Sequence, residues 1–254
     1  MTTNLSIWIS GPFGKMGTAL RTVLEDVTDI SITGIVSPEH SGQTCDIAGT
    51  SMTVHDSLED LAQSSPLPDV IVDFTFAKVA YEGALFAAKN DIDFVTGTTG
   101  MTPDQKQEVI EAFSTSKGHA IIASNFSLGA VLMMHFAAQA AQHFTHAEIV
   151  ETHHTQKKDA PSGTAITTRT MMAENSPMSG NDIPIHSLRL PGAIAHQQVH
   201  LSSPGEILRL EHDANDRSCF MPGIILAIRH VHGVDGAIFS IESLLFPDDD
   251  LKQA

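Results

Sequence analysis

Short apolar runs alternate with amphipathic segments through the first half of the chain. The apolar runs are rich in Ile, Val and Phe, as is typical of buried strands. We expect strands at 5–10, 30–37, 68–75, 92–100 (ending in a Gly/Thr loop) and 119–127. We expect helices between them at 18–27, 79–90 and 102–113. Because strands that alternate with helices form parallel sheets covered on both faces, this half is predicted to be α/β.

The pattern changes near residues 125–126, where a longer apolar helix precedes several strand-like segments. We expect this helix at 128–144, a surface loop at 172–184, and strands at 146–154, 185–192, 196–203 and 206–213. The last three segments alternate apolar and polar residues, which suits an open mixed or antiparallel sheet. We expect the segment 217–231, where Pro222 opens a helix, to return to the first fold. The prediction is one domain of residues 1–125 and 218–254 with an inserted α+β domain of residues 126–217.

Composition narrows the classes of function. Of the 254 residues, 42 % are hydrophobic and 17 % are charged, as in a soluble globular protein with a sizeable core. The formal net charge of −16 argues against nucleic-acid binding, and an anionic substrate would need a local group of donors. Cys45 and Cys219 are expected to be reduced thiols. No signal peptide or membrane-length apolar run is evident, so we expect a cytoplasmic protein with no membrane partner.

Three glycines separate the first expected strand from the first helix. Gly11, Gly14 and Gly17 in "GPFGKMG" would form a tight turn that directs backbone N–H groups and the positive helix end toward a phosphate. This placement favours a dinucleotide site over a plain turn, although Phe13 stands where GxGxxG has its second glycine. The "GTTG" segment at 97–100 follows another strand and would lie at the ligand-binding edge of the sheet, but a polar turn is the alternative.

The group that binds the cofactor ribose should follow the second strand, about 20 residues after the glycines. Ser37 and Pro38 stand there, and Glu39 comes next, where it could bind the ribose diol of NADH. No arginine adjoins Glu39 in the sequence to bind the 2′-phosphate of NADPH, though Lys15 or His40 could do so. Both nicotinamide cofactors stay open at this point.

The segment "ETHHTQKKDAPSGTA" at 151–165 gathers positive and titratable side chains in an otherwise acidic chain. Ser162, Gly163 and Thr164 precede an apparent helix at 165–174. Their free N–H groups and hydroxyls would therefore form a cradle for a carboxylate.

Four side chains of this segment would strengthen an anion site. Lys157 and Lys158 add positive charge, and His153 and His154 add donors that titrate near neutral pH. The alternative is that the two lysines belong to an ordinary solvated loop.

These segments carry a resemblance to a known family. Residues 151–165 resemble the E-x-H-H-x-x-K-x-D-x-P-S-G-T-A signature of the 4-hydroxy-tetrahydrodipicolinate reductases (dihydrodipicolinate reductases), and every fixed position matches. "GPFGKMG", "DFT" (73–75), "GTTG", "SNFSLG" (124–129) and "RLPGAIAHQ" (189–197) are similar to segments of the same family, in the same order. The resemblance implies an oxidoreductase that uses NADH or NADPH to reduce the cyclic dicarboxylate precursor of diaminopimelate and lysine.

The resemblance also implies roles for the domains and for single residues. The first domain would be Rossmann-like, and the second would bind the small dicarboxylate and assemble a homotetramer through its open sheet. His153 would be the acid/base residue, and Lys157 the proton donor and carboxylate partner. The substrate would be bound by His154, Gly163 and Thr164, to which the helix-start argument adds Ser162. The cofactor would be bound by Gly11, Pro12, Phe13, Gly14, Lys15, Met16, Gly97, Thr98, Thr99, Ala123, Ser124, Asn125 and Phe126, to which the strand-end argument adds Glu39.

Two rival functions are distinguishable by their residues. A different two-domain NAD(P)-dependent reductase of the aldehyde type would use a nucleophilic cysteine. Cys45 and Cys219 lie outside both the GTTG segment and residues 151–165, which counts against this reading. An inactive cofactor-binding regulator or redox sensor would be expected to have lost its acid/base residues, yet both histidines of the pair and Lys157 are present.

A metal site is the last chemistry that the sequence raises. His196 and His200 form an HxxxH pattern, a spacing that can bind a metal on a helix. They lie, however, in an alternating segment that we expect to be a strand. We therefore predict no metal.

Overall fold

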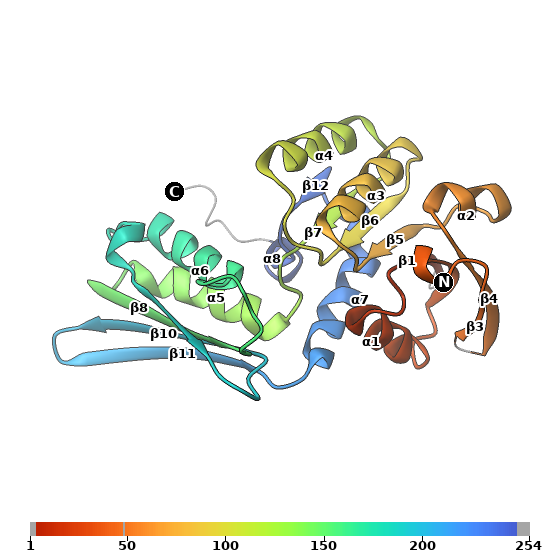
Figure 1. The fold of residues 1–254 in the computed structure, drawn as a ribbon. Coiled ribbons are helices and arrows are strands. Elements are labelled where there is room, and N and C mark those ends of the chain that lie inside the picture. Colours follow the sequence, from red (N-terminus) through yellow and green to blue (C-terminus); the bar gives the residue numbers. More distant parts are fainter. Residues whose placement is uncertain (1–3, 48, 248–254) are drawn as a thin grey trace. The chain divides into compact units, whose positions relative to one another are not determined.

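The computed structural model describes residues 4–47 and 49–247 (Figure 1). The chain divides into two compact units. Unit 1 comprises residues 1–124 and 223–254, and unit 2 comprises residues 125–222. The sequence placed these boundaries at 125/126 and 217/218, whereas the units change at 124/125 and 222/223.

Within the described residues, unit 1 contains an eight-stranded sheet of order β12-β7-β6-β5-β1-β2-β4-β3. Its strands are β1 (Leu5–Ser10), β2 (Ile30–Val36), β3 (Thr44–Ile47), β4 (Thr50–His55), β5 (Val70–Asp73), β6 (Asp93–Thr96), β7 (Ala120–Ile122) and β12 (Ala237–Ile238). The described neighbours pair in parallel, except β3 with β4. Strand β1 lies between β2 and β5, so the loop that follows β1 sits where the strand order reverses, as in dinucleotide-binding folds.

Burial on both faces of this sheet explains why its strands are apolar throughout. Trp8, Ile71 and Phe94 join a core cluster with residues of the helices on one face. Their sequence neighbours Ile9 and Val72 point to the other face and are equally inaccessible to solvent. The predicted parallel sheet, covered on both sides, is confirmed.

Helices and short 3₁₀ turns connect these strands. The helices are α1 (Lys15–Leu24), α2 (Leu58–Ser64), α3 (Ala77–Lys89), α4 (Pro103–Thr115), α7 (Met221–His230) and α8 (Glu242–Leu245), and the 3₁₀ turns are η1 (Pro38–His40) and η4 (Val231–Gly233). At the start of α4, the Thr102 side chain accepts a hydrogen bond from the Gln105 N–H, and the Gln105 side chain accepts one from the Thr102 N–H. This is a capping box, which explains why the helix begins there.

Unit 2 contains a mixed sheet of four described strands in the order β11-β10-β8-β9. Its elements are α5 (Leu128–Ala141), β8 (His146–His153), α6 (Gly163–Glu174), η2 (Gly180–Asp182), β9 (Ile185–Arg189), β10 (Ala195–Ser203), β11 (Glu206–Ala214) and η3 (Arg217–Phe220). Strands β8 and β9 are parallel, while β10 is antiparallel to both β8 and β11. Helices α5 and α6 pack on each other and against the sheet (Figure 1). The predicted open mixed sheet is confirmed.

Two predicted bounds differ from the structure, and some elements were missed. The first helix spans 15–24 rather than 18–27, because Gly14 serves as its N-cap and the last loop residues are already helical. The loop expected at 172–184 begins later, because α6 continues to Glu174, where the helix expected at 165–174 also ends. The hairpin β3–β4 and the helix α2 were missed; α2 is short and starts where the Ser57 hydroxyl accepts a hydrogen bond from the Asp60 N–H. Among the described residues, no helix is long and apolar enough to span a bilayer.

Candidate active site

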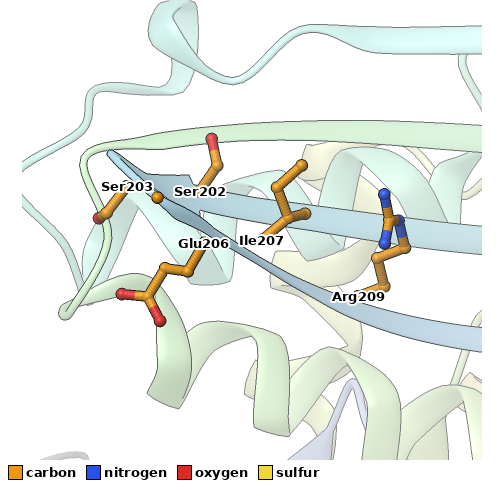
Figure 2. Close-up of a pocket in the computed structure, with 6 residues that line it drawn as sticks. Ser202, Ser203, Glu206, Ile207 and Arg209 are labelled. Carbon is orange, nitrogen blue, oxygen red and sulfur yellow. The ribbon is translucent and has the colours of Figure 1, made fainter.

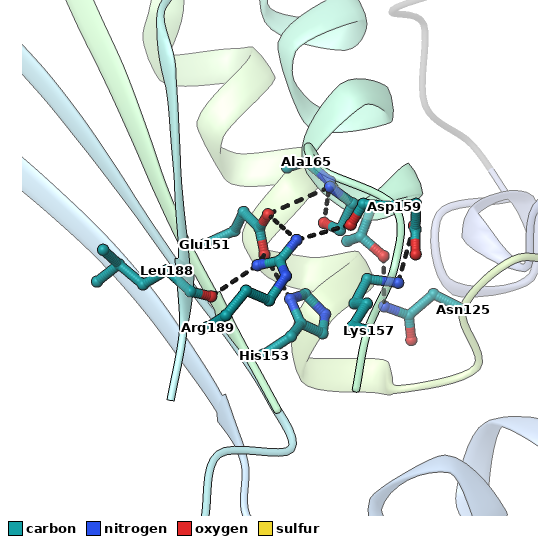
Figure 3. Close-up of polar contacts among 10 residues, drawn as sticks. Asn125, Glu151, His153, Lys157, Asp159, Ala165, Leu188 and Arg189 are labelled. Atoms are coloured by element: carbon teal, nitrogen blue, oxygen red, sulfur yellow. Dashed lines mark hydrogen bonds and ion pairs between the residues drawn. The ribbon is translucent and has the colours of Figure 1, made fainter. Parts of the chain in front are cut away.

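A buried acid at the end of β8 organises the polar residues of unit 2 (Figure 3). Glu151 is 0 % exposed and lies two residues before His153, so both side chains point to the same face of the strand. Arg189, the last residue of β9, is the registered neighbour of His153. Its Nη1 donates to Glu151 Oε2 at 3.0 Å and its Nη2 donates to Glu151 Oε1 at 2.9 Å. This two-pronged pair is the strongest ion-pair geometry available to a carboxylate.

The same pair fastens the following loop to the sheet. Arg189 Nη2 also donates to the carbonyl oxygen of Asp159 at 2.7 Å. The backbone N–H of Ser162 donates to Glu151 Oε1 at 3.3 Å. Asp159, in the middle of residues 154–162, and Ser162, at their end, are therefore bonded to Arg189 and Glu151. These bonds give Lys157 a defined place.

His153 is oriented by Glu151. Its Nδ1 is hydrogen-bonded to Glu151 Oε2. Burial raises the pKa of Glu151, but the bonds from Arg189 and other donors outweigh it and leave this pKa below its ordinary value. The ionised carboxylate can only accept, so Nδ1 carries the proton and Nε2 is left for a ligand. Burial lowers the pKa of His153, and the nearby charges of Lys157 and Arg189 lower it further. The bond to Glu151 raises this pKa but does not outweigh them, so the neutral imidazole is favoured.

This lowered pKa predicts how stability depends on pH. Between the folded-state pKa of His153 and its ordinary value, the unfolded chain carries the proton and the folded chain does not. The free energy of unfolding should therefore fall as the pH drops through that window, by no more than about 1.4 kcal/mol per pH unit for one group. Urea unfolding at a series of pH values should show a shallower dependence for His153→Gln than for the unaltered chain. Equal slopes would contradict the assignment.

Lys157 and Lys158 have different surroundings. The Lys157 side chain is 22 % exposed, and its ammonium lies 2.9 Å from Asp159 Oδ2; this bond lowers the pKa of Asp159. Lys158 is exposed. The arrangement brings Lys157 together with His153 in one cluster and leaves Lys158 in solvent. His154 is half-buried, and its carbonyl oxygen accepts a hydrogen bond from the Lys157 N–H.

The start of α6 offers free backbone donors. Ser162 is its N-cap: the hydroxyl is buried and accepts a hydrogen bond from the Ala165 N–H at 3.2 Å. With its own N–H on Glu151, Ser162 has little left for a ligand and shapes the site instead. Gly163 is exposed, and a Cβ placed there would meet nothing within 4 Å. The Thr164 hydroxyl accepts a bond from Asn125 Nδ2 at 3.3 Å. The helix N-terminus at Gly163 and Thr164 is therefore open, and its backbone N–H groups could accept an anion.

The glycine loop of unit 1 shows which glycines its own backbone requires. Gly11 has φ of +78°, and a Cβ there would lie 2.7 Å from the Phe74 carbonyl oxygen. A Cβ at Gly17 would lie 2.2 Å from the Gly11 carbonyl oxygen, so this glycine lets α1 approach the loop. A Cβ at Gly14 would meet only that oxygen, at an ordinary 3.6 Å. The open space around Gly14, at the positive end of α1, fits a pyrophosphate.

The rest of the predicted cofactor set is spread over neighbouring strand ends. Pro12, Ala123 and Phe126 are buried, whereas Lys15, Glu39, Thr99 and Ser124 are exposed and Met16 and Gly97 are half-buried. Asn125 and Phe126 open unit 2, so nothing places them against the loop of unit 1. Glu39 lies on η1, which follows β2.

The sequence missed an arginine near the expected ribose position. The Arg21 guanidinium, from α1, lies 5.2 Å from the centre of the Phe13 ring. The His40 ring packs on Phe13 with centroids 4.3 Å apart, and its Nδ1 lies 2.9 Å from the Ser37 hydroxyl. Phe13, which replaces the usual glycine, therefore gathers two nitrogen-bearing side chains near the end of β2.

A buried acid also holds the Gly/Thr loop after β6. Asp73 is 1 % exposed and accepts hydrogen bonds from the hydroxyls of Thr75 at 2.7 Å and Thr98 at 2.9 Å. Burial raises its pKa, and these hydroxyl bonds oppose the rise only in part. Asp73 was not predicted as a site residue. It positions Thr98, and the signals in the sequence were its place at the end of an apolar strand and in the family-like segment "DFT" (73–75).

Two other features stand apart from this chemistry. His196 Nδ1 bonds to Asp213 Oδ1 at 2.6 Å, and the described part of the chain gives the His196/His200 pair no third metal ligand. A pocket at the turn between β10 and β11 is lined by residues such as Ser203, Glu206 and Arg209 (Figure 2). No predicted site residue lines it, so we give it no part in catalysis.

Comparison with known proteins agrees with the sequence resemblance. The family model "Dihydrodipicolinate reductase, N-terminus" matches residues 5–126, and "Dihydrodipicolinate reductase, C-terminus" matches residues 129–245. The 4-hydroxy-tetrahydrodipicolinate reductase of Streptococcus sanguinis is 40 % identical over 95 % of this chain and 100 % of its own length. That of Thermosynechococcus vestitus is 37 % identical over 96 % of this chain and 98 % of its own.

A solved structure gives the same result. The dipicolinate-bound dihydrodipicolinate reductase from Paenisporosarcina sp. TG-14 superimposes with a TM-score of 0.82 at 33 % identity, covering 94 % of this chain and 99 % of that one. Both halves of the sequence and the fold of nearly the whole chain point to one group of enzymes. The chain belongs to the 4-hydroxy-tetrahydrodipicolinate reductase (dihydrodipicolinate reductase) family.

Proposed function

We propose that this chain uses NADH or NADPH to reduce the cyclic dicarboxylate 4-hydroxy-tetrahydrodipicolinate to tetrahydrodipicolinate, a step of diaminopimelate and lysine biosynthesis. The observation that carries the proposal is the cluster in unit 2, where Lys157 and His153 are held in place beside the open start of α6. Such a cluster supplies the positive charge and hydrogen-bond donors that bind a small diacid, and a group that can give the diacid a proton. Dipicolinate, which is bound to the Paenisporosarcina enzyme, is a small cyclic diacid.

The two carboxylates have separate partners in this proposal. The N–H groups of Gly163 and Thr164 and the Thr164 hydroxyl bind one carboxylate at the helix start. Lys157 binds the other with the donors that its ammonium does not share with Asp159. His154 contacts the substrate as well. Because Glu151 and Arg189 fix the loop that carries Lys157, the ammonium is ordered before the substrate arrives.

Proton delivery falls to the same cluster. The 4-hydroxyl group of the substrate leaves as water, which leaves an electron-poor ring carbon conjugated with the imine. Hydride adds to that carbon, and the neighbouring carbon becomes electron-rich and takes a proton. The Lys157 ammonium can donate that proton and stabilise the developing negative charge while it is attached. The Nε2 of His153, freed by the Nδ1–Glu151 bond, is placed to exchange protons with the substrate.

The residues of unit 1 fit a nicotinamide dinucleotide, which supplies the hydride when bound. The start of α1 at Gly14 would hold the pyrophosphate, and Thr98, fixed by Asp73, would line the adjacent edge. Glu39 would bind the ribose of NADH, while the Arg21 guanidinium and the His40 ring near Phe13 offer a positive charge and a hydrogen-bonding nitrogen for the 2′-phosphate of NADPH. The chain therefore carries groups for either cofactor.

Gly14→Val should weaken cofactor binding without disturbing the loop. Its side chain would extend into the space left for the pyrophosphate, and overpacking costs about 1–3 kcal/mol, or about tenfold to a hundredfold in Kd. Titration of NADH and NADPH against fluorescence would measure this. Unchanged affinity, with an unchanged melting temperature, would show that the loop is only a turn. Gly17→Ala is the contrasting variant, because its clash is internal and should lower stability instead.

The function itself is tested by following oxidation of each cofactor after addition of freshly prepared cyclic substrate. Turnover with either nicotinamide supports the proposal. Binding of cofactor without turnover would favour the rival reading of an inactive regulator. The aldehyde-type reductase is disfavoured because Cys219, whose pKa is raised by burial, lacks the character of a nucleophilic thiolate.

The assembly and the compartment belong to the same proposal. We propose a homotetramer formed through the sheet face of unit 2 that α5 and α6 leave uncovered, where Leu188 and Ile207 are exposed. A solution mass four times that of the 27.2 kDa chain would support it. A cytoplasmic location agrees with the two unpaired thiols, Cys45 and Cys219.

A further inference from the structure

Three residues of metal-binding types, one aspartate and two histidines, converge in unit 1 at the sheet edge opposite the predicted cofactor residues. Asp93 is the first residue of β6, His119 directly precedes β7, and His232 lies on η4. Each can offer one ligand atom, and the three atoms lie within 4.8 Å of one another. The parallel pairing of β6 with β7 makes Asp93 and His119 neighbours, and η4 brings His232 to the same strand end.

The distances in this cluster suit a shared cation. His119 Nδ1 lies 3.2 Å from Asp93 Oδ1, and His232 Nδ1 lies 3.4 Å from Asp93 Oδ2. A charge-assisted hydrogen bond brings such atoms to about 2.7–2.9 Å. Two ligands of a tetrahedral zinc ion, each at about 2.0–2.2 Å from the metal, are instead about 3.4 Å apart. The 3.2 Å contact is also at the long end of the hydrogen-bond range, and both spacings are close to the distance between two ligands of one zinc ion.

The surroundings of the three residues support ligation. Asp93 is 6 % exposed, and the backbone N–H of His119 donates to its Oδ1 at 2.8 Å, which fixes the carboxylate as an outer partner does in metal sites. The His232 side chain is 85 % exposed. It leaves a path by which an ion can enter and room for water at a fourth position.

We propose that Asp93, His119 and His232 bind one divalent transition-metal ion of the zinc type. The site stabilises the fold by tying η4, in the returning C-terminal segment, to the sheet. It takes no part in hydride transfer, because it lies at the amino ends of β6 and β7, whereas the predicted cofactor residues follow their carboxyl ends. The four residues of β6 separate the two edges by about 10 Å.

This proposal differs from the expectation of no metal, which was based on His196 and His200. The three ligands are far apart in the sequence and form no spacing motif. Only the register of β6 with β7 and the position of η4 bring them together. No sequence pattern could have identified them.

The test uses the full chain after treatment with a chelator, with Zn²⁺ and Co²⁺ as the probes. Zn²⁺ titration by calorimetry should show one site of highest affinity, and Zn²⁺ should raise the melting temperature. Co²⁺ should give the intense visible absorption of a tetrahedral or five-coordinate nitrogen–oxygen site. His232→Gln, at an exposed position, should fold normally and weaken Zn²⁺ binding by at least about tenfold. It should also abolish the rise in melting temperature with Zn²⁺ and the visible absorption with Co²⁺.

His186→Gln is the matched control, because His186 also contacts a carboxylate, Glu148, on the surface, and the described residues give this pair no third ligand. It should bind Zn²⁺ like the unaltered chain. Absence of Zn²⁺ stabilisation in the unaltered chain, or equal affinity in His232→Gln and His186→Gln, would overturn the proposal. Turnover of His232→Gln should equal that of the unaltered chain, so failure here is separable from failure of the proposed reductase function.

Discussion

Lys157→Ala is expected to lower turnover by about 10²–10⁴-fold, because in the proposed function it removes the proton donor and a charge that stabilises the transition state. The Lys157 ammonium is partly shielded, bonded to Asp159 and carried by a loop that Arg189 fastens to Glu151. Such a group is ordered before substrate binds, so its loss cannot be replaced by a mobile neighbour. Steady-state kinetics with the cyclic substrate and saturating cofactor measures the change.

Lys158→Ala is the matched control for this experiment. It removes the same charge one residue away, from a side chain that points to solvent, and turnover should stay near that of the unaltered chain. Lys157→Arg separates the two roles of the residue, since arginine keeps the charge but does not give up its proton. It should restore KM more than turnover. Near-normal turnover in Lys157→Ala, or an equal loss in Lys158→Ala, would remove Lys157 from the proposed role.

The sequence predicted well those features of the fold that depend on residues close together in the chain. Apolar runs separated by amphipathic segments predicted the sheet of unit 1, and Thr102 followed by Pro103 predicted the start of α4. The change of pattern near residue 125 predicted a second unit. These features are encoded locally, by side-chain periodicity and by helix capping. The hairpin β3–β4 was missed because its strands are short and largely exposed, and exposed strands lack the apolar pattern that identifies buried ones.

The site was less predictable where it depends on contacts between distant segments. His153 and Lys157 belong to one motif, but Arg189 reaches them only because β9 pairs in parallel with β8. Asp73 acts on Thr98 through the pairing of β5 with β6, which brings two strand ends together. Strand order and register decide such contacts, and neither can be read from residue spacing.

Glu151→Ala is expected to lower the free energy of unfolding by about 3–5 kcal/mol, the usual cost of removing one partner of a buried ion pair. The variant leaves the Arg189 guanidinium without its carboxylate, and it removes the acceptors for His153 Nδ1 and the Ser162 N–H. Four segments lose a common anchor, namely β8, β9, the loop before α6 and the start of α6. Urea unfolding measures the loss, and turnover should fall as well because Lys157 and His153 lose their fixed positions.

Two further variants test whether the Glu151–Arg189 pair accounts for the loss of stability. Glu148→Ala lies on the same strand with its side chain 60 % exposed beside His186, and a surface pair of this kind contributes about 0–1 kcal/mol. The double variant Glu151→Ala with Arg189→Met removes both charges, so the penalty of an unpaired buried cation disappears and much of the stability should return. Turnover should not return with it, since the loop is no longer fastened. If Glu151→Ala costs no more stability than Glu148→Ala, the buried pair does not organise this site.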